Sequence, residues 1–212
     1  DSTKVIYIAS PNNPTGTYLT RNQIVKLMQN ISQNIIVVLD GAYVEYVQKE
    51  DYDKGFSLSD EFDNLIMTRT FSKTYGLAAL RIGWCYTSQK VADIINKIKP
   101  PFNTTSISQA MAIKALEDPL YIEKIVKLNS DVKTWFESEL YKLKIKIKET
   151  EGNFSLIETS IDGADKIANH LANDGIIVRR LDSYNLPNFL RISIGTKEEM
   201  ELTINSLKKF NE

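Results

Sequence analysis

The stretch Ile35–Leu39 is an unbroken run of aliphatic residues, and it constrains the fold more than any other part of the sequence. A strand that is apolar at every position is typical of a parallel sheet covered on both faces. Thr20 and Gln23 have the spacing of a capping box and are followed by apolar residues at helical spacing, which predicts a helix before this strand. A further apolar run, Val5–Ile8, precedes a turn-rich loop. Strand, loop, helix and strand in this order predict an α/β fold with a mostly parallel sheet and helices on both of its faces.

The rest of the chain predicts two more strands and then a second, smaller domain. Residues 65–68 and 83–86 are further apolar runs, and the two prolines in 99–105 mark a boundary. We therefore expect residues 1–100 to form part of a large domain. Residues 101–212 are expected to form an interdomain helix, with a restart at Asp118–Pro119, and a small C-terminal α/β (α+β) domain. Its predicted strands lie near 143–148, 154–158, 176–179 and 190–194, with helices near 163–173 and 197–209.

Composition excludes several classes of function. Lysine and arginine number 26 and aspartate and glutamate 27, so the net charge of −1 gives no basic surface for nucleic acid. No run of apolar residues is long enough to span a membrane. The one cysteine, Cys85, is predicted to be buried and unreactive, which suits a cytoplasmic protein. The one histidine, His170, supports neither a metal site nor a serine-type triad by itself.

Two further stretches of the sequence bear on the edge of the second predicted sheet and on the N-terminus of the chain. Leu143, Ile145 and Ile147 alternate with lysines, which predicts a half-buried edge strand that the lysines protect from pairing. The N-terminus has neither a charged region nor an apolar region of a signal peptide, and it enters a strand almost at once. We expect the chain to be part of a longer protein.

Polar residues follow the predicted strands, where open α/β sheets build their sites. They are Asn13, Asp40 with Tyr43, the segment Thr70–Lys73, and Arg81. Each has an ordinary structural interpretation: a turn at Asn13, a helix cap at Asp40, a solvated charge at Arg81. Together they form a more specific set.

The set matches the needs of pyridoxal 5′-phosphate. A neutral lysine amine, here Lys73, forms a Schiff base with an aldehyde. A carboxylate such as Asp40 keeps the pyridine nitrogen protonated. Asn13 and Tyr43 can donate hydrogen bonds to the O3′ oxygen. The phosphate needs hydroxyls and a fixed cation, and the residues suited to it are Thr70, Ser72 and Arg81.

The motifs SPNNPTG (10–16), VVLDGAYVEY (37–46) and TRTFSKTYGLAALRIGW (68–84) resemble those of fold-type I pyridoxal-phosphate aminotransferases of class II. The histidinol-phosphate aminotransferase branch is the most similar, and the resemblance extends to GIIVRRLDSYNLPNFLRISIGTKEE (175–199). It implies that Lys73 is the Schiff-base lysine and Asp40 the partner of the pyridine nitrogen. It places Asn13 and Tyr43 at O3′ and Thr70, Ser72 and Arg81 at the phosphate. It also implies that Arg191 binds the anionic group of the substrate, that Arg179 helps to hold a substrate phosphate, and that the enzyme is a homodimer.

The resemblance leaves several functions open. The first is transfer of an amino group between L-histidinol phosphate and 2-oxoglutarate. An aromatic-amino-acid aminotransferase and a threonine-phosphate decarboxylase are alternatives with the same kind of site. The family's enzymes are longer, so a truncated, inactive chain that acts as a structural or interaction module is an alternative of another class. The family usually has an acidic residue where this chain has Gly41.

Overall fold

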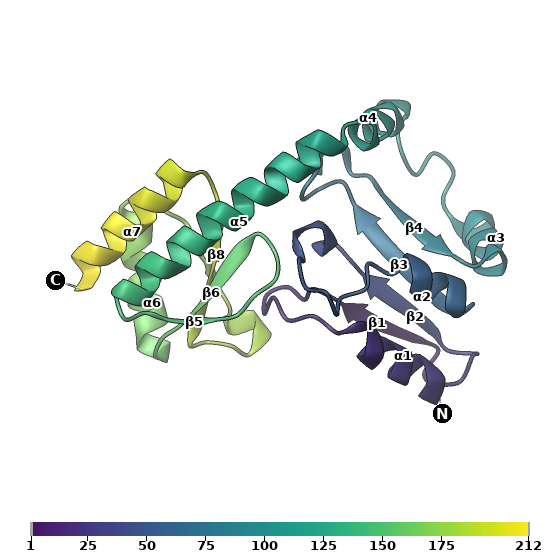
Figure 1. Cartoon of the computed structure of the whole chain (residues 1–212), viewed down its shortest axis with the longest axis horizontal. Coiled ribbons are helices and arrows are strands. Elements are labelled where there is room, and N and C mark those ends of the chain that lie inside the picture. The colour runs from purple at the N-terminus through teal and green to yellow at the C-terminus, as the bar shows by residue number, and fades with distance from the viewer. Residues whose placement is uncertain (1, 212) are drawn as a thin grey trace. The chain divides into compact units, whose positions relative to one another are not determined.

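The computed structural model describes residues 2–211 and divides them into two compact units (Figure 1). Of the described residues, the first unit contains those up to Asn12 and Tyr18–Lys124, and the second contains Asn13–Thr17 and those from Ile125 onward. The sequence-based boundary after residue 100 lies earlier in the chain than the boundary between these units, which falls within a helix.

The first unit is built on a four-stranded sheet in the order β1-β2-β3-β4 (Figure 1). The strands are β1 (Val5–Ala9), β2 (Ile36–Asp40), β3 (Leu65–Thr70) and β4 (Gly83–Thr87). β2 runs parallel to both β1 and β3, whereas β4 is antiparallel to β3. The predicted strands and the α/β class are confirmed.

Two of the four described helices of the first unit, α1 (Arg21–Asn30) and α4 (Ser106–Leu116), begin at a threonine that caps them. The others are α2 (Phe56–Glu61) and α3 (Gln89–Ile98), with short 3-10 turns η1 (Val44–Tyr46) and η2 (Ala78–Leu80). The predicted capping box is confirmed. The Gln23 backbone N–H donates to Thr20 Oγ1 at 3.3 Å, and the Thr20 N–H donates to Gln23 Oε1 at 2.9 Å.

One face of this sheet carries the core of the unit. Side chains of α1, β2, α2 and β3 form it: Ile24, Met28, Val37, Leu39, Leu58 and Leu65. On the opposite face Tyr7 is 77% exposed and Cys85 is exposed. The prediction of a buried Cys85 is therefore wrong, because position 85 projects from the face of β4 opposite to the core.

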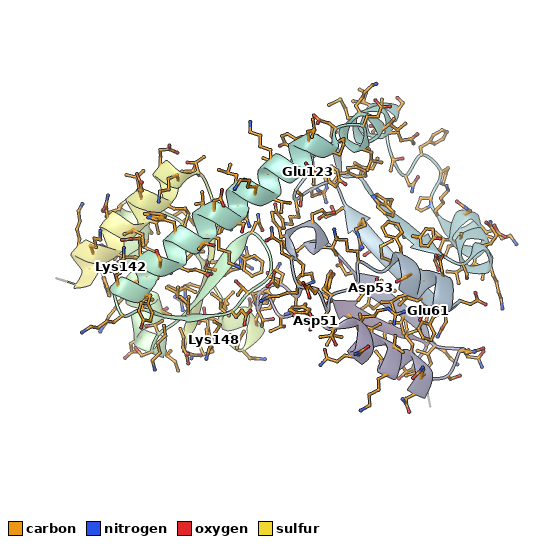
Figure 2. All side chains as sticks on the ribbon, viewed as in Figure 1. Asp51, Asp53, Glu61, Glu123, Lys142 and Lys148 are labelled. Carbon is orange, nitrogen blue, oxygen red and sulfur yellow. The ribbon has the colours of Figure 1, made fainter. Side chains whose placement is uncertain are left out.

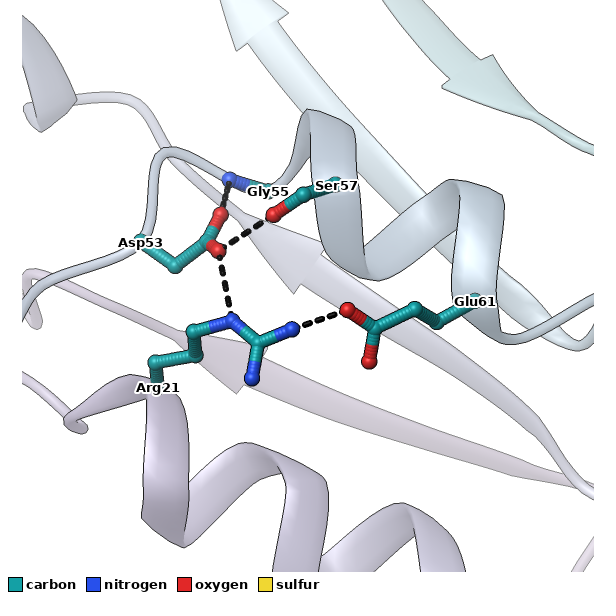
Figure 3. A network of polar contacts seen from close by, with 5 residues as sticks. All are labelled: Arg21, Asp53, Gly55, Ser57 and Glu61. Atoms are coloured by element: carbon teal, nitrogen blue, oxygen red, sulfur yellow. Dashed lines mark hydrogen bonds and ion pairs between the residues drawn. The ribbon is translucent and has the colours of Figure 1, made fainter.

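Polar contacts join the start of α1 to α2 (Figure 3). Arg21 forms ion pairs with Asp53, at 3.3 Å from its Nε, and with Glu61. Asp53 also accepts hydrogen bonds from the Gly55 N–H at 2.6 Å and the Ser57 hydroxyl at 2.5 Å. These contacts fix the turn that precedes α2.

The second unit is a small sheet with helices. Its elements are the larger part of α5 (Pro119–Lys142), β5 (Lys146–Lys148), β6 (Phe154–Glu158), α6 (Ile161–Asn173), β7 (Arg179–Arg180), η3 (Asp182–Tyr184), β8 (Phe189–Ser193) and α7 (Lys197–Asn211). The order β5-β6-β8-β7 is antiparallel throughout. The helix restart predicted at Pro119 and the alternation of strands and helices are confirmed, although the strand expected near 176–179 is only the pair Arg179–Arg180.

The core of the second unit joins its helices to its sheet. Phe136 and Leu140 of α5, Leu171 of α6 and Leu190 of β8 are fully buried within it. β5 is an edge strand, as the alternating lysines predicted, and Lys148 pairs with Glu158 of β6 at 2.9 Å. Figure 2 shows Lys142 at the end of α5 and Lys148 near β5, both with outward side chains.

Candidate active site

Two neighbouring parallel strands of the first unit end in polar residues. β2 ends at Asp40 and β3 at Thr70, and Asp40 is aligned with Thr68 in the register between them. Because the strands are parallel, their carboxyl ends lie at the same edge of the sheet. The Asp40 carboxylate is exposed there, and its Oδ1 accepts hydrogen bonds from the Ala42 N–H at 3.1 Å and from Thr68 Oγ1 at 3.4 Å.

Lys73 lies in the loop that follows β3. Phe71 and Thr74 on either side are buried, whereas Lys73 itself is exposed. The loop is closed by hydrogen bonds from the Gly76 N–H to the Lys73 carbonyl at 2.9 Å and from the Leu77 N–H to the Phe71 carbonyl at 2.8 Å. Lys73 Nζ lies 5.4 Å from the centre of the Tyr43 ring, so these two residues are brought together.

Arg81 is held beside the same loop. Its backbone adopts a left-handed conformation, with φ at 49°, at the end of η2. Its Nη1 donates to the Ala78 carbonyl at 2.6 Å and lies 3.5 Å from Ser72 Oγ. The Ser72 N–H in turn donates to Thr70 Oγ1 at 3.0 Å. The guanidinium and two hydroxyls thus form a compact cationic, hydrogen-bonding group.

These side chains line one hollow of about 520 Å³. Its lining residues are Asp40, Ala42, Thr68, Arg69, Thr70, Ser72, Lys73, Ala78 and Arg81. The hollow thus offers an amine, a carboxylate and an anion-binding group to one ligand. Sequence reasoning missed Thr68, although its two-residue spacing from Thr70 on β3 places both on one face.

The other predicted residues belong to the second unit. Arg191 of β8 donates from Nη1 to Asn13 Oδ1 at 2.5 Å, and its guanidinium carbon lies 5.2 Å from the centre of the Phe154 ring. Arg191 Nε is buried and has no hydrogen-bond partner among the described residues. Asn13 is thus grouped with Arg191, whereas the amine and the carboxylate lie in the first unit.

Arg179 and Arg180 are adjacent but differ in their partners. Arg180 forms ion pairs with Asp165 and, at 2.9 Å, with Asp182. Arg179 has no carboxylate partner among the described residues, and it is the register partner of Arg191. Arg179 is the member of the pair that is available to an external anion.

A second hollow, of about 640 Å³, lies in the second unit beside α7 and residues 174–178. Aliphatic side chains make up much of its lining, and none of the residues predicted to carry chemistry lines it. Over the described part of the chain, His, Cys, Asp and Glu form no group able to hold a metal ion. No described helix is both long and apolar enough to cross a membrane.

Comparison with known proteins places the chain among aminotransferases. The family profile "Aminotransferase class I and II" matches residues 1–207. The histidinol-phosphate aminotransferase of Pelagibacter ubique is 43% identical over 209 residues, which are 97% of this chain and 58% of that protein. The Granulibacter bethesdensis protein of the same name is 41% identical, over 98% of this chain and 56% of its own length.

A solved structure agrees with the sequence relatives. The crystal structure of histidinol-phosphate aminotransferase from Sinorhizobium meliloti in complex with pyridoxal-5′-phosphate superposes with a TM-score of 0.90 and 28% identity, covering 98% of this chain and 57% of that one. The chain thus spans a little over half the length of the relatives it matches. The match over residues 1–207 and these relatives show that the chain belongs to the aminotransferase class I and II family.

Proposed function

We propose that the chain is part of a pyridoxal-phosphate-dependent enzyme that transfers an amino group between L-histidinol phosphate and 2-oxoglutarate. The observation that carries this proposal is the convergence of Lys73, Asp40 and Arg81 on one hollow at the carboxyl ends of parallel strands. The relatives that are 41–43% identical, and are named histidinol-phosphate aminotransferases, support the choice of substrate.

The residues of the hollow suit the proposed cofactor, which when bound supplies an electron sink for the bond that breaks at the substrate carbon. Asp40, held by the Ala42 N–H and Thr68, would keep the pyridine nitrogen protonated. Thr70, Ser72 and Arg81 would bind the phosphate as an array of hydroxyls and a guanidinium. Tyr43 and Asn13 would donate to the O3′ oxygen.

Lys73 has two roles in the proposal. Its Nζ would hold the cofactor through the aldehyde carbon, with loss of water. As a free amine, Nζ would also be placed to accept a proton from the substrate carbon and to return a proton at the other end of the transfer. The exposed position of Lys73 in a loop closed by backbone hydrogen bonds gives the amine access to both.

Arg191 and Arg179 are proposed to bind the anionic end of the substrate. Arg191 has a buried Nε without a partner among the described residues, and a guanidinium can donate two parallel hydrogen bonds to a carboxylate or a phosphate. This allows one site to receive both a dicarboxylate and a phosphate ester. Arg179, opposite Arg191, adds a second cation that favours the phosphate.

The enzyme is further proposed to be a homodimer. α4 supports this, because Ile107, Met111 and Leu116 are exposed on a helix in which Ser108 and Ala112 are the buried residues. Light scattering after size-exclusion chromatography would show twice the chain mass for a dimer. A monomer at all concentrations would rule the dimer out for this chain.

The decisive experiment incubates the 212-residue chain with pyridoxal phosphate and then with borohydride, and maps the fixed mass by peptide mass spectrometry. The proposal expects preferential modification of Lys73, absent in Lys73→Ala and retained in Lys97→Ala, which removes an exposed lysine of α3. Turnover is then compared for histidinol phosphate, phenylalanine and threonine phosphate. Labelling of many lysines at similar rates would contradict the proposed cofactor site. Selective labelling of Lys73 without any turnover would identify the chain as an inactive binding module.

A further inference from the structure

A buried arginine lies directly behind the hollow. Arg69 sits on β3 between Thr68 and Thr70, and by strand alternation its side chain points to the opposite face of the sheet from theirs. The residue is 6% exposed. Burying a charged side chain costs free energy unless it is well hydrogen-bonded and has opposite charges nearby. The buried guanidinium of Arg69 therefore needs a physical explanation.

The guanidinium of Arg69 connects three segments. Nη1 donates to the Thr68 carbonyl at 2.8 Å, and Nη2 donates to the Lys54 carbonyl. The Thr68 carbonyl also accepts from the Gly41 N–H at 3.2 Å. A Cβ at position 41 would overlap Arg69 Nη1, so the guanidinium packs closely against the residue next to Asp40 and would have to shift for any larger residue there.

Glu45 extends this arrangement to the lysine loop. Thr74, which follows Lys73 and is 2% exposed, donates from Oγ1 to Glu45 Oε2 at 3.2 Å. Burial raises the pKa of Glu45, and the positive charges of Arg69 and Lys54 oppose that rise. Burial lowers the pKa of Arg69, against the attraction of Tyr52, Glu45 and Asp40.

We propose that Arg69 and Glu45 are positioning residues that couple the segment carrying Asp40 to the loop carrying Lys73. Gly41 packs against Arg69, Glu45 is bonded to Thr74, and the opposite charges of Arg69 and Glu45 attract each other. Together these interactions hold the carboxylate and the amine in a fixed relationship although they follow different strands. The inference rests on the proposed function for its catalytic meaning, while the coupling itself is a property of the first unit.

The coupling is measured by hydrogen exchange in the 212-residue chain without cofactor. Two amides report on the lysine loop, Gly76 and Leu77, and two on the Asp40 segment, Gly41 and Ala42. Glu45→Gln and Thr74→Val are expected to raise exchange at least threefold in both segments. Thr203→Val is the matched control, because it also removes a buried threonine hydroxyl, which donates to the Glu199 carbonyl in the second unit.

A second readout connects the coupling to the amine. The pH profile of Lys73 labelling by pyridoxal phosphate and borohydride is recorded relative to Lys97 in the same molecule. Glu45→Gln is expected to shift the pH profile and to lower the ratio of Lys73 labelling to Lys97 labelling at least threefold. Arg69→Lys is expected to lower this labelling ratio less than Arg69→Met does. A purely structural role would change the urea midpoint and leave the ratio and profile alone.

The outcomes separate the two proposals. If exchange rises only at Gly76 and Leu77, or nowhere, in both Glu45→Gln and Thr74→Val, the coupling is overturned. If exchange rises in both segments but wild-type Lys73 is labelled no faster than Lys97, the coupling stands and the proposed cofactor site fails. Should Arg69→Met not fold, the Glu45 and Thr74 variants still decide the question.

Discussion

Arg179 and Arg191 stand directly opposite each other on the antiparallel strands β7 and β8. Opposed residues of an antiparallel pair project from the same face of the sheet, and like charges in this position repel. An anion between the two guanidinium groups would relieve the repulsion and accept hydrogen bonds from both. We therefore propose Arg179 and Arg191 as the anion-binding pair of the second unit, since Arg180 is already paired with two carboxylates.

Removing the Arg179 side chain should selectively weaken the binding of substrates that carry a phosphate. A lost charge-assisted hydrogen bond of about 1.5–3 kcal/mol predicts a rise in KM of roughly tenfold or more for histidinol phosphate in Arg179→Ala. Phenylalanine, which lacks a phosphate, should show little change. Arg180→Ala is the matched control, and an equal effect of both variants would show that the local positive charge matters rather than the position opposite Arg191.

Glu45 should make stability depend on pH. Its pKa is raised in the folded state by burial, so the folded state favours the protonated form. The stabilisation is fully present below the unfolded pKa of 4.5 and is lost as pH rises through the folded pKa, at about 1.4 kcal/mol per unit of difference. Urea unfolding between pH 4 and 8 should therefore show the stability of Glu45→Gln rising relative to wild type as pH increases.

Glu123→Gln, on α5, is the control for this measurement and should follow the wild-type curve. A constant difference between Glu45→Gln and wild type at all pH values would contradict the raised pKa.

The capping box of α1 should contribute measurably to stability. Thr20→Ala removes the hydroxyl that accepts from the Gln23 N–H, and an N-cap of this type is worth about 1 kcal/mol. Thr20→Ser keeps the acceptor and should remain within a few tenths of a kcal/mol of wild type. Urea unfolding measures both, and equal loss in the two variants would point to the methyl group instead.

Cys85 should react in the folded protein. Its residue is exposed on β4, so a disulfide reagent such as Ellman's should modify it fully without denaturant. The rate should lie within about tenfold of that in urea, because an exposed thiol is accessible to the reagent in the folded protein as it is in the unfolded chain. Cys85→Ser gives the blank, and protection of a hundredfold or more would restore the original prediction of a buried thiol.

Local sequence patterns were enough to predict much of the fold. The Thr20–Gln23 capping box, the β1–β3 strands and the lysine-protected edge at β5 follow from side-chain chemistry within a few residues, and the structure has each of them. Cys85 was mispredicted because an apolar strand does not say which of its faces another element covers. The structure leaves that face of β4 open.

Arg69 shows the limit of the same reasoning. In the sequence it is one arginine among threonines, for which a solvated side chain is the ordinary expectation. Only the packed structure reveals that it is buried and that its guanidinium packs closely against Gly41, next to Asp40.

The sequence by itself determined the α/β class, the family resemblance and the candidate chemistry of Lys73, Asp40 and Arg81. These depend on residue type, periodicity and motif, all of which are local. The tertiary structure decided which of these residues share a hollow, that Asn13 is bonded to Arg191, and that Arg179 rather than Arg180 lacks a carboxylate partner among the described residues. Such relationships join residues far apart in the chain, and strand register and burial fix them only once the chain has packed.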